Sequence, residues 1–246
     1  MKTKVWAHRG ASGYMPENTL PSFKKAVELG ADGVELDIQL SKDGEIVVCH
    51  DEAVDRTSNA KGWLKDYTLA ELKAMDFSYQ FKELGKVSIP TMKEVFELLK
   101  PTNLIINIEL KTGIFDYEGI EEKIIALTHA EGFEDRVIYS SFNHYSIMKI
   151  QELDPNAKTA FLYSDGPLDM PLYGYEHHVN ALHPAAYNLR LPNFMEECNV
   201  YHLDVNVWTV NTEEIALMCL KYGVNTLITN YPDRIKKVIE QYETGI

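Results

Sequence analysis

Two carboxylates stand one residue apart in Gly33–Gln39, a segment with the apolar character of a strand. Side chains two apart in a strand point to the same face, so Glu35 and Asp37 lie on one face and Leu36 lies on the other. Neighbouring carboxylates repel each other unless a proton, a cation or an arginine lies between them. In a buried site a divalent cation with oxygen ligands relieves this repulsion best, and the alternative is an outward, solvated pair.

The same alternation recurs at the end of a second apolar segment, in Asn107-Ile108-Glu109-Leu110-Lys111. Glu109 is a candidate for a third carboxylate on the cation. Lys111 is a candidate partner of a phosphate, or a positive charge that offsets the carboxylates. A plain ion pair between Glu109 and Lys111 is the alternative.

Two histidines follow strand-like segments, where the active sites of α/β barrels form. His8 is followed by Arg9, and His50 closes a later apolar stretch. A single histidine of this kind is more often a hydrogen-bonded structural residue. As a pair beside carboxylates, however, they can act as base and acid near neutral pH. Arg9 and Lys111 supply the local positive charge that holds an anion.

Together these residues match the needs of phosphodiester cleavage. That reaction requires a nucleophile to be deprotonated, a leaving alkoxide to be protonated, and a more anionic transition state to be stabilised by cations. Two aromatic residues, Phe142 and Trp208, follow later strand-like segments. Each is either a packing residue or a wall for a small ligand.

Repeated β/α units must position these groups, because short apolar segments alternate with amphipathic ones. The predicted strands are Val5–His8, Gly33–Gln39, Ile46–His50, Leu104–Leu110, Arg136–Ser141, Thr159–Tyr163, Asn180–His183, Val205–Val210 and Thr226–Thr229. The predicted helices include Pro21–Leu29, Met92–Leu99, Glu118–His129, Tyr145–Leu153, Glu213–Tyr222 and Pro232–Tyr242. Plausible N-caps are Thr19, Thr91 and Thr212.

Nine strands are one too many for a (β/α)₈ barrel, and the linker between the second and third explains the excess. It is too short for a parallel crossover, and Asp43-Gly44 is a hairpin turn signal. A two-residue turn there pairs Leu40 with Val47 and Asp37 with His50. The third segment is then an antiparallel arm, and eight barrel strands remain.

The sequence therefore predicts one catalytic domain over residues 1–246, an α/β fold of the TIM-type (β/α)₈ class. Residues 51–90 interrupt the β/α rhythm and form a small insertion after the second strand and its hairpin. A segment of this length is either a lid or substrate-shaping element at the catalytic end, or a decorative loop. The stretch 163–191 carries no readable motif.

The composition of the chain limits the classes of partner that it can be expected to bind. The formal charge of −13 disfavours nucleic acid and anionic membranes, so we expect neither nucleic acid nor stable membrane association. Neither a signal peptide nor a transmembrane stretch is evident, and the three cysteines lack motif spacing. We expect a cytoplasmic protein whose partner is a small anionic molecule, and an oligomer is compatible with the sequence.

An ordered set of motifs resembles the glycerophosphodiester phosphodiesterases, from about residue 4 to residue 235. The motifs are His8-Arg9-Gly10, Pro16-Glu17-Asn18-Thr19, Glu35-Leu36-Asp37, Asp43-Gly44 leading to His50-Asp51, Glu109-Leu110-Lys111, Ser141-Phe142 and Trp208-Thr209-Val210-Asn211. The set is highly specific, although no single member of it is.

The resemblance implies metal-dependent hydrolysis of glycerophosphodiesters, such as glycerophosphocholine or glycerophosphoethanolamine, to an alcohol and sn-glycerol 3-phosphate. It implies the following roles: His8 and His50 as the acid–base pair, Glu35, Asp37 and Glu109 on one Ca²⁺ or Mg²⁺ ion, Arg9 and Lys111 on the phosphate, and Phe142 and Trp208 beside the glycerol. Asn18 is a weaker candidate for a hydrogen bond near the site.

The mechanism it suggests runs through a cyclic phosphate that water then opens. The alternatives are a lipid phosphodiesterase, of lysophospholipase D or phosphoinositide phospholipase C type, and a non-catalytic barrel that binds a phosphate ligand.

Overall fold

In the computed structural model, which describes residues 2–245, the strands are short and most of their residues are buried, as in strands covered on both faces. The strands are β1 (Lys4–His8), β2 (Gly33–Leu40), β3 (Ile46–Val48), β4 (Ile105–Leu110), β5 (Val137–Ser141), β6 (Lys158–Tyr163), β7 (Ala181–Pro184), β8 (Asp204–Val207) and β9 (Thr226–Thr229). The helices are α1 (Leu20–Glu28), α2 (Leu69–Ala74), α3 (Met92–Leu99), α4 (Ile120–Glu131), α5 (His144–Leu153), α6 (Met170–Glu176), α7 (Phe194–Val200), α8 (Glu213–Tyr222) and α9 (Pro232–Thr244).

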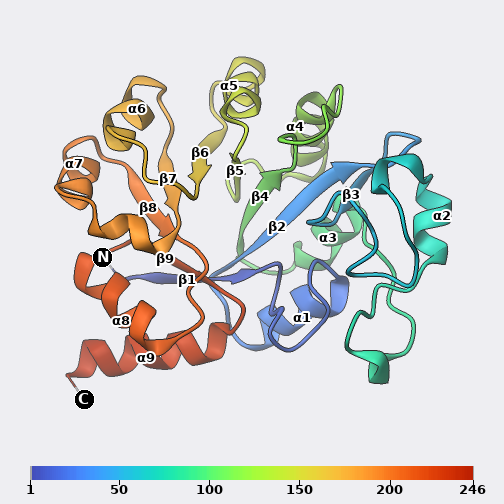
Figure 1. The fold of residues 1–246 in the computed structure, drawn as a ribbon, viewed down its shortest axis with the longest axis horizontal. Helices are drawn as coiled ribbons and strands as arrows, with labels where there is room; N and C mark the ends of the chain where they lie inside the picture. The colour runs from blue at the N-terminus through green and yellow to red at the C-terminus, as the bar shows by residue number, and fades with distance from the viewer. Residues whose placement is uncertain (1, 246) are drawn as a thin grey trace.

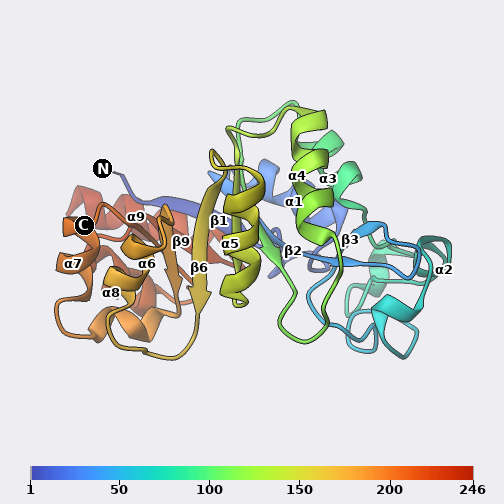
Figure 2. The same cartoon turned by 90° about the horizontal axis from the view of Figure 1, so that it is seen from above.

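Eight strands of the described chain close into a parallel ring. Their order is β1-β9-β8-β7-β6-β5-β4-β2, and the pairing of β1 with β2 closes it. Helices pack around the outside, so the main apolar core lies between strands and helices (Figures 1 and 2). The fold is the predicted TIM barrel. Among residues 2–245, every helix is too short or too polar to cross a bilayer.

Helix starts follow their capping residues closely. Thr19, Thr91 and Thr212 all act as N-caps, and α3 and α8 have the predicted bounds. At α3, Glu94 completes a capping box with Thr91, and the two side chains accept hydrogen bonds from two backbone N–H groups at the start of the helix. Three short helices, α2, α6 and α7, were not predicted.

The hairpin between β2 and β3 is antiparallel as predicted, but its predicted register is wrong by one residue. Leu40 pairs with Ile46 rather than Val47, which makes a three-residue loop. Ser41 closes it, because its Oγ donates to Asp43 and accepts from the backbone N–H of Glu45, while Gly44 adopts a positive φ of 80°. Asp37 then lies beside Cys49 rather than His50.

β2 is the longest strand and changes partner along its length. On one edge it pairs with β1 through Gly33, Val34 and Glu35, and farther along the same edge it pairs with β3. The other edge pairs with β4 from Gly33 to Ile38. β3 therefore takes over where β1 ends, and it ends at Val48, two residues earlier than predicted. Through this succession His50, which follows β3, lines the same cavity as His8, which ends β1.

The insertion, residues 51–90, has a small apolar core of its own, separate from the barrel core. Its buried members are Val54, Leu64, Leu72, Phe77 and Ile89, and they pack with Val47 of β3 and with Cys49 just after that strand. Two 3₁₀ turns, at Leu64–Asp66 and Lys82–Leu84, flank α2. The segment lies on the β3 side of the barrel, far from β6 to β8 (Figures 1 and 2).

Candidate active site

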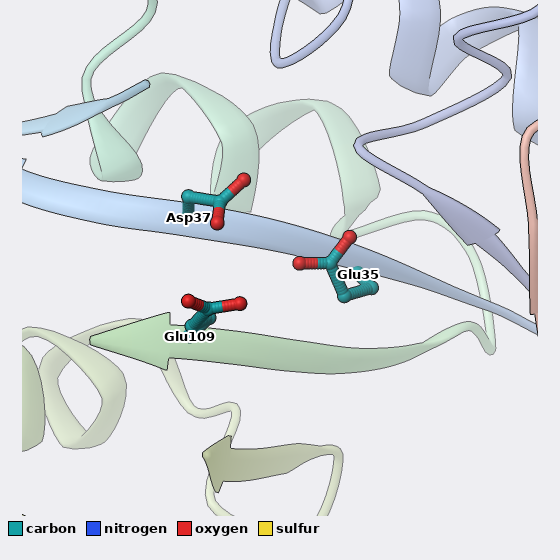
Figure 3. Close-up of side chains that lie close together, drawn as sticks. All are labelled: Glu35, Asp37 and Glu109. Carbon is teal, nitrogen blue, oxygen red and sulfur yellow. The ribbon is translucent and has the colours of Figure 1, made fainter. Parts of the chain in front are cut away.

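Three buried carboxylates converge inside the barrel near the carboxyl ends of its strands. Glu35 and Asp37 come from β2 and Glu109 from β4, and register pairs Asp37 with Glu109 (Figure 3). One carboxylate oxygen of each lies within 4.8 Å of the others. Because alternate residues of a strand share a face, Leu36 and Ile38 point away from the barrel interior, into the main apolar core between the strands and the helices.

This convergence raises the free energy of the ionised state. Burial and the charges of Asp37 and Glu109 raise the pKa of Glu35 well above its ordinary value. Burial and Asp37 also raise the pKa of Glu109, although Lys111 opposes the rise. Burial acts on Asp37 too, but the charges of His50, Arg9 and Lys111 outweigh it and lower its pKa.

Among the described residues, one fully buried oxygen of the trio accepts no hydrogen bond, namely Oδ1 of Asp37. A buried acceptor without a partner is costly, and a divalent cation satisfies it while neutralising the excess charge. The donor set is oxygen only, which suits Ca²⁺ and Mg²⁺. The residues present therefore fit such an ion.

His8 ends β1 at the edge of the trio. Its Nδ1 lies 2.7 Å from Oδ1 of Asn230, which follows the last strand, and its Nε2 lies 3.9 Å from Oε2 of Glu35. Burial, and then the charge of Arg9, lower the pKa of His8 to about 4. The ring is therefore neutral at pH 7, and with the proton on Nδ1 its Nε2 is free to accept one.

Arg9 turns away from the strand with a positive φ of 53°. Its backbone N–H donates to Glu35 at 2.8 Å, its Nη1 donates to Glu17 at 2.8 Å, and its Nε lies 3.5 Å from Asp37. Gly10 continues the turn at φ 77°, where a Cβ would lie 2.1 Å from Oγ of Ser22. Only glycine fits there, and the tight turn keeps Arg9 beside the carboxylates.

His50 reaches the same site from the hairpin. Its Nδ1 lies 2.7 Å from Oδ1 of Asp51, and Nζ of Lys111 lies 3.3 Å from its Nε2. Lys111 also donates to Oε1 of Glu109 at 3.0 Å. Contrary to the prediction from the sequence, His50 is not paired with Asp37 in the hairpin. The chain bends after Val48, so His50 approaches from a loop.

Phe142 and Trp208 contact each other edge to face, with ring centroids 5.7 Å apart. They line a cavity of about 230 Å³ that also contains His8, Glu35, His50 and Glu109. Leu162 and Ile228 add apolar surface to its lining. The lining of the cavity therefore combines apolar side chains with ionisable ones.

Asn18, the weaker candidate, contacts the trio directly: its Nδ2 donates to Oδ2 of Asp37 at 2.8 Å. Sequence reasoning gave no role to Asn230, Glu17, Asp51 or Arg56, although each bonds a site residue or its partner. Glu17 and Asp51 stood next to residues already singled out. Arg56 lies in the irregular insertion, where no periodic pattern marks it.

Comparison with known proteins gives one consistent family. The model of the glycerophosphoryl diester phosphodiesterase family matches residues 8–234. A glycerophosphodiester phosphodiesterase of Caldanaerobacter subterraneus subsp. tengcongensis is 43% identical over 242 residues, 98% of this chain and 99% of that protein. One of Bacillus altitudinis is 41% identical, with 97% and 99% covered.

Solved structures agree. A phosphodiesterase of Oleispira antarctica, in complex with the product sn-glycerol-3-phosphate, superposes with a TM-score of 0.86 at 29% identity, covering 97% of each chain. A glycerophosphodiester phosphodiesterase of Thermotoga maritima gives 0.78 at 29% identity, with 97% of this chain and 99% of that one covered.

Proposed function

The chain belongs to the glycerophosphoryl diester phosphodiesterase family, and from that membership we propose that it hydrolyses glycerophosphodiesters with the help of one divalent cation. The products are an alcohol and sn-glycerol 3-phosphate, and candidate substrates are glycerophosphocholine and glycerophosphoethanolamine. The observation that carries the proposal is that three buried carboxylates, two histidines and two cationic side chains lie together at one site.

In this proposal Glu35, Asp37 and Glu109 hold the cation, which is Ca²⁺ or Mg²⁺. When bound, it stabilises negative charge that develops on the phosphoryl oxygens. Arg9 and Lys111 bind the phosphate as the cationic partners that an acidic protein needs locally. Their neighbours support this role, because Glu17 and Glu109 fix the direction of each side chain.

The two histidines divide the proton transfers. His8, neutral at pH 7, accepts the proton of the glycerol hydroxyl next to the phosphate, and that oxygen attacks phosphorus to form a cyclic phosphate. His50 donates a proton from Nε2 to the oxygen of the departing alcohol, while the Asp51 carboxylate on Nδ1 stabilises the protonated ring. Water then opens the cyclic phosphate with the two roles exchanged.

The geometry of two cavities supports an assignment of the substrate's two ends. Phe142 and Trp208 wall the glycerol in the first. A second cavity, of about 260 Å³, shares His8 and Arg9 with the first. It is also lined by Glu17 of the loop after β1 and by four residues of the insertion, Arg56, Tyr79, Gln80 and Phe81. We assign the alcohol end to this second cavity, which gives residues 51–90 a substrate-shaping role within the single catalytic domain.

The location that fits this reaction is the cytoplasm. All three cysteines are buried and free, and free cysteines are typical of proteins from a reducing compartment.

The direct test is release of glycerol 3-phosphate from several glycerophosphodiesters, with and without EDTA, followed by Ca²⁺ or Mg²⁺. We expect release that EDTA abolishes and one of the two ions restores. Lysophosphatidylcholine serves as the comparison substrate. A strong preference for this lipid over glycerophosphocholine would favour the lipid phosphodiesterase alternative, and full activity in EDTA would reject the cation.

A further inference from the structure

One arginine of the insertion bonds two carboxylates at the edge of the site. Arg56 donates to Asp51 from Nε and Nη2, at 2.6 and 3.0 Å, and to Glu17 from Nη1 and Nη2, both at 2.7 Å. A guanidinium presents its N–H groups in a planar fork that matches carboxylate geometry, which a lysine cannot do. Arg56 is therefore a two-sided bridge between the insertion and the loop after β1.

Each of these carboxylates in turn bonds a residue to which the proposed reaction gives a role. Oδ1 of Asp51 lies 2.7 Å from Nδ1 of His50. Oε1 of Glu17 accepts from Nη1 of Arg9 at 2.8 Å. Arg56 thus reaches the proposed acid and the proposed phosphate ligand, each through one intermediate carboxylate.

We propose that Arg56 is a positioning residue, one that orients His50 through Asp51 and Arg9 through Glu17. The inference rests on the proposed function, because the groups that Arg56 orients have roles only in that reaction.

The charges show why the bridge matters. Burial opposes ionisation of Glu17, but hydrogen bonds from Arg56 and the charge of Arg9 outweigh it and lower the Glu17 pKa. The hydrogen bond with His50, and then Arg56, lower the pKa of Asp51. Without Arg56, two ionised carboxylates would face each other across the same space. They would turn apart, and His50 would lose a fixed partner on Nδ1.

The fold of the insertion determines where Arg56 lies. Val54, two residues earlier, is fully buried in the small core with Leu64 and Leu72. The guanidinium carbon of Arg56 lies 5.9 Å from the centre of the Tyr79 ring, within reach of a cation–π contact. The bridge therefore makes the order of the proposed catalytic groups depend on a segment outside the barrel.

The test compares Arg56→Ala and Arg56→Lys with the control Lys61→Ala, which removes an exposed charge from the same insertion. Loss of a residue that orients a metal ligand typically costs about 10- to 100-fold in activity, and we take the same range for a residue that orients a catalytic group. We expect Arg56→Ala to lose kcat by that factor with little change in cation affinity, Arg56→Lys to be intermediate, and Lys61→Ala to match the wild type. Melting temperatures verify that each variant is folded, and Arg56→Lys carries the test if Arg56→Ala does not fold.

A double-mutant cycle with Asp51→Asn separates positioning from general stability. If Arg56 acts through Asp51, the double variant loses less than the product of the two single losses. Multiplicative losses in kcat, or wild-type kcat in both Arg56 variants, would overturn the inference. Failure of the proposed function looks different, because the wild type itself would then release no glycerol 3-phosphate.

Discussion

Nζ of Lys111 lies 3.3 Å from Nε2 of His50. The same Nζ donates to Glu109 at 3.0 Å, so one ammonium stands between a proposed proton donor and a proposed cation ligand. Burial opposes the charged form of Lys111, but the charges of Glu109 and Asp37 outweigh it and raise its pKa, so the side chain stays cationic.

Replacing Lys111 by Met should therefore lower kcat/KM by about 100-fold, because a desolvated cation is lost from the transition state. Cation affinity should hold or rise, since a positive charge beside Glu109 has been removed. Steady-state kinetics and calorimetric titration with Ca²⁺ or Mg²⁺ measure the two effects. A variant with weaker cation binding and unchanged kcat/KM would mean that Lys111 only supports Glu109.

The three carboxylates, Glu35, Asp37 and Glu109, should lower the stability of the unloaded protein by their mutual repulsion, while they provide the affinity for the cation. Glu35→Gln removes one of three buried charges, and the unloaded protein should be more stable by about 1 kcal/mol or more, which is about 2–4 °C in Tm at this chain length. The same change should weaken cation affinity and activity together. Thermal unfolding in EDTA, and again with added cation, tests both halves, with the exposed Glu118→Gln as the control. An unloaded variant that melts lower than the wild type would contradict the repulsion.

The two histidines should respond differently to the leaving group. A p-nitrophenyl ester of glycerol phosphate has a leaving oxygen that needs no protonation, whereas a choline ester needs it. His50→Ala should thus be impaired much less on the aryl ester than on glycerophosphocholine. His8→Ala should be impaired by about 100- to 10,000-fold on both, with cation binding nearly intact. Equal impairment of His50→Ala on the two substrates would remove His50 as the acid.

His183 makes stability depend on pH. It is fully buried on β7, its Nε2 lies 2.9 Å from Nδ2 of Asn206, and burial lowers its pKa to about 3. An unfolded histidine titrates near 6.5, so between pH 6.5 and pH 3 the unfolded chain binds the proton that the folded chain refuses. Stability is complete above pH 6.5 and falls as pH drops.

From pH 7 to pH 5 this single group should cost about 2 kcal/mol of unfolding free energy. Urea unfolding of the wild type and of His183→Gln at both pH values measures the difference, because all other titrating groups are common to the two proteins. Identical losses in the two proteins would show that another group governs the acid side.

Much of the site was readable because β structure has a period of two. Alternation alone placed Glu35 with Asp37, and strand ends gave His8 and Lys111. The hairpin register was not readable: Asp43-Gly44 suggests a two-residue turn, but Oδ1 of Asp43 accepts from the backbone N–H of Leu69 and from Ser41, and the loop lengthens. The conformation of the turn therefore depends on a hydrogen bond to a residue 26 positions away, and the local sequence does not show this partner.

The helix α6 could not be predicted from the sequence for a related reason. α6 contains Pro171 and Gly174, and its propensity is poor. Tertiary contact stabilises it instead, since a Cβ on Gly174 would lie 3.0 Å from Leu182. Arg56 was equally invisible, because its two partners are fixed by the folded insertion and by a loop 39 residues away in the chain.

The hydrogen bond between His8 and Asn230 joins residues 222 positions apart, from the first strand and the end of the last. The three carboxylates, by contrast, come from two adjacent strands in the first half of the chain. A refolding chain can therefore regain its ion site while the ring is still open, but it can orient His8 only when the ring closes. We expect turnover to return later than ion binding during refolding. The recovery of activity would then mark the closure of the strand ring.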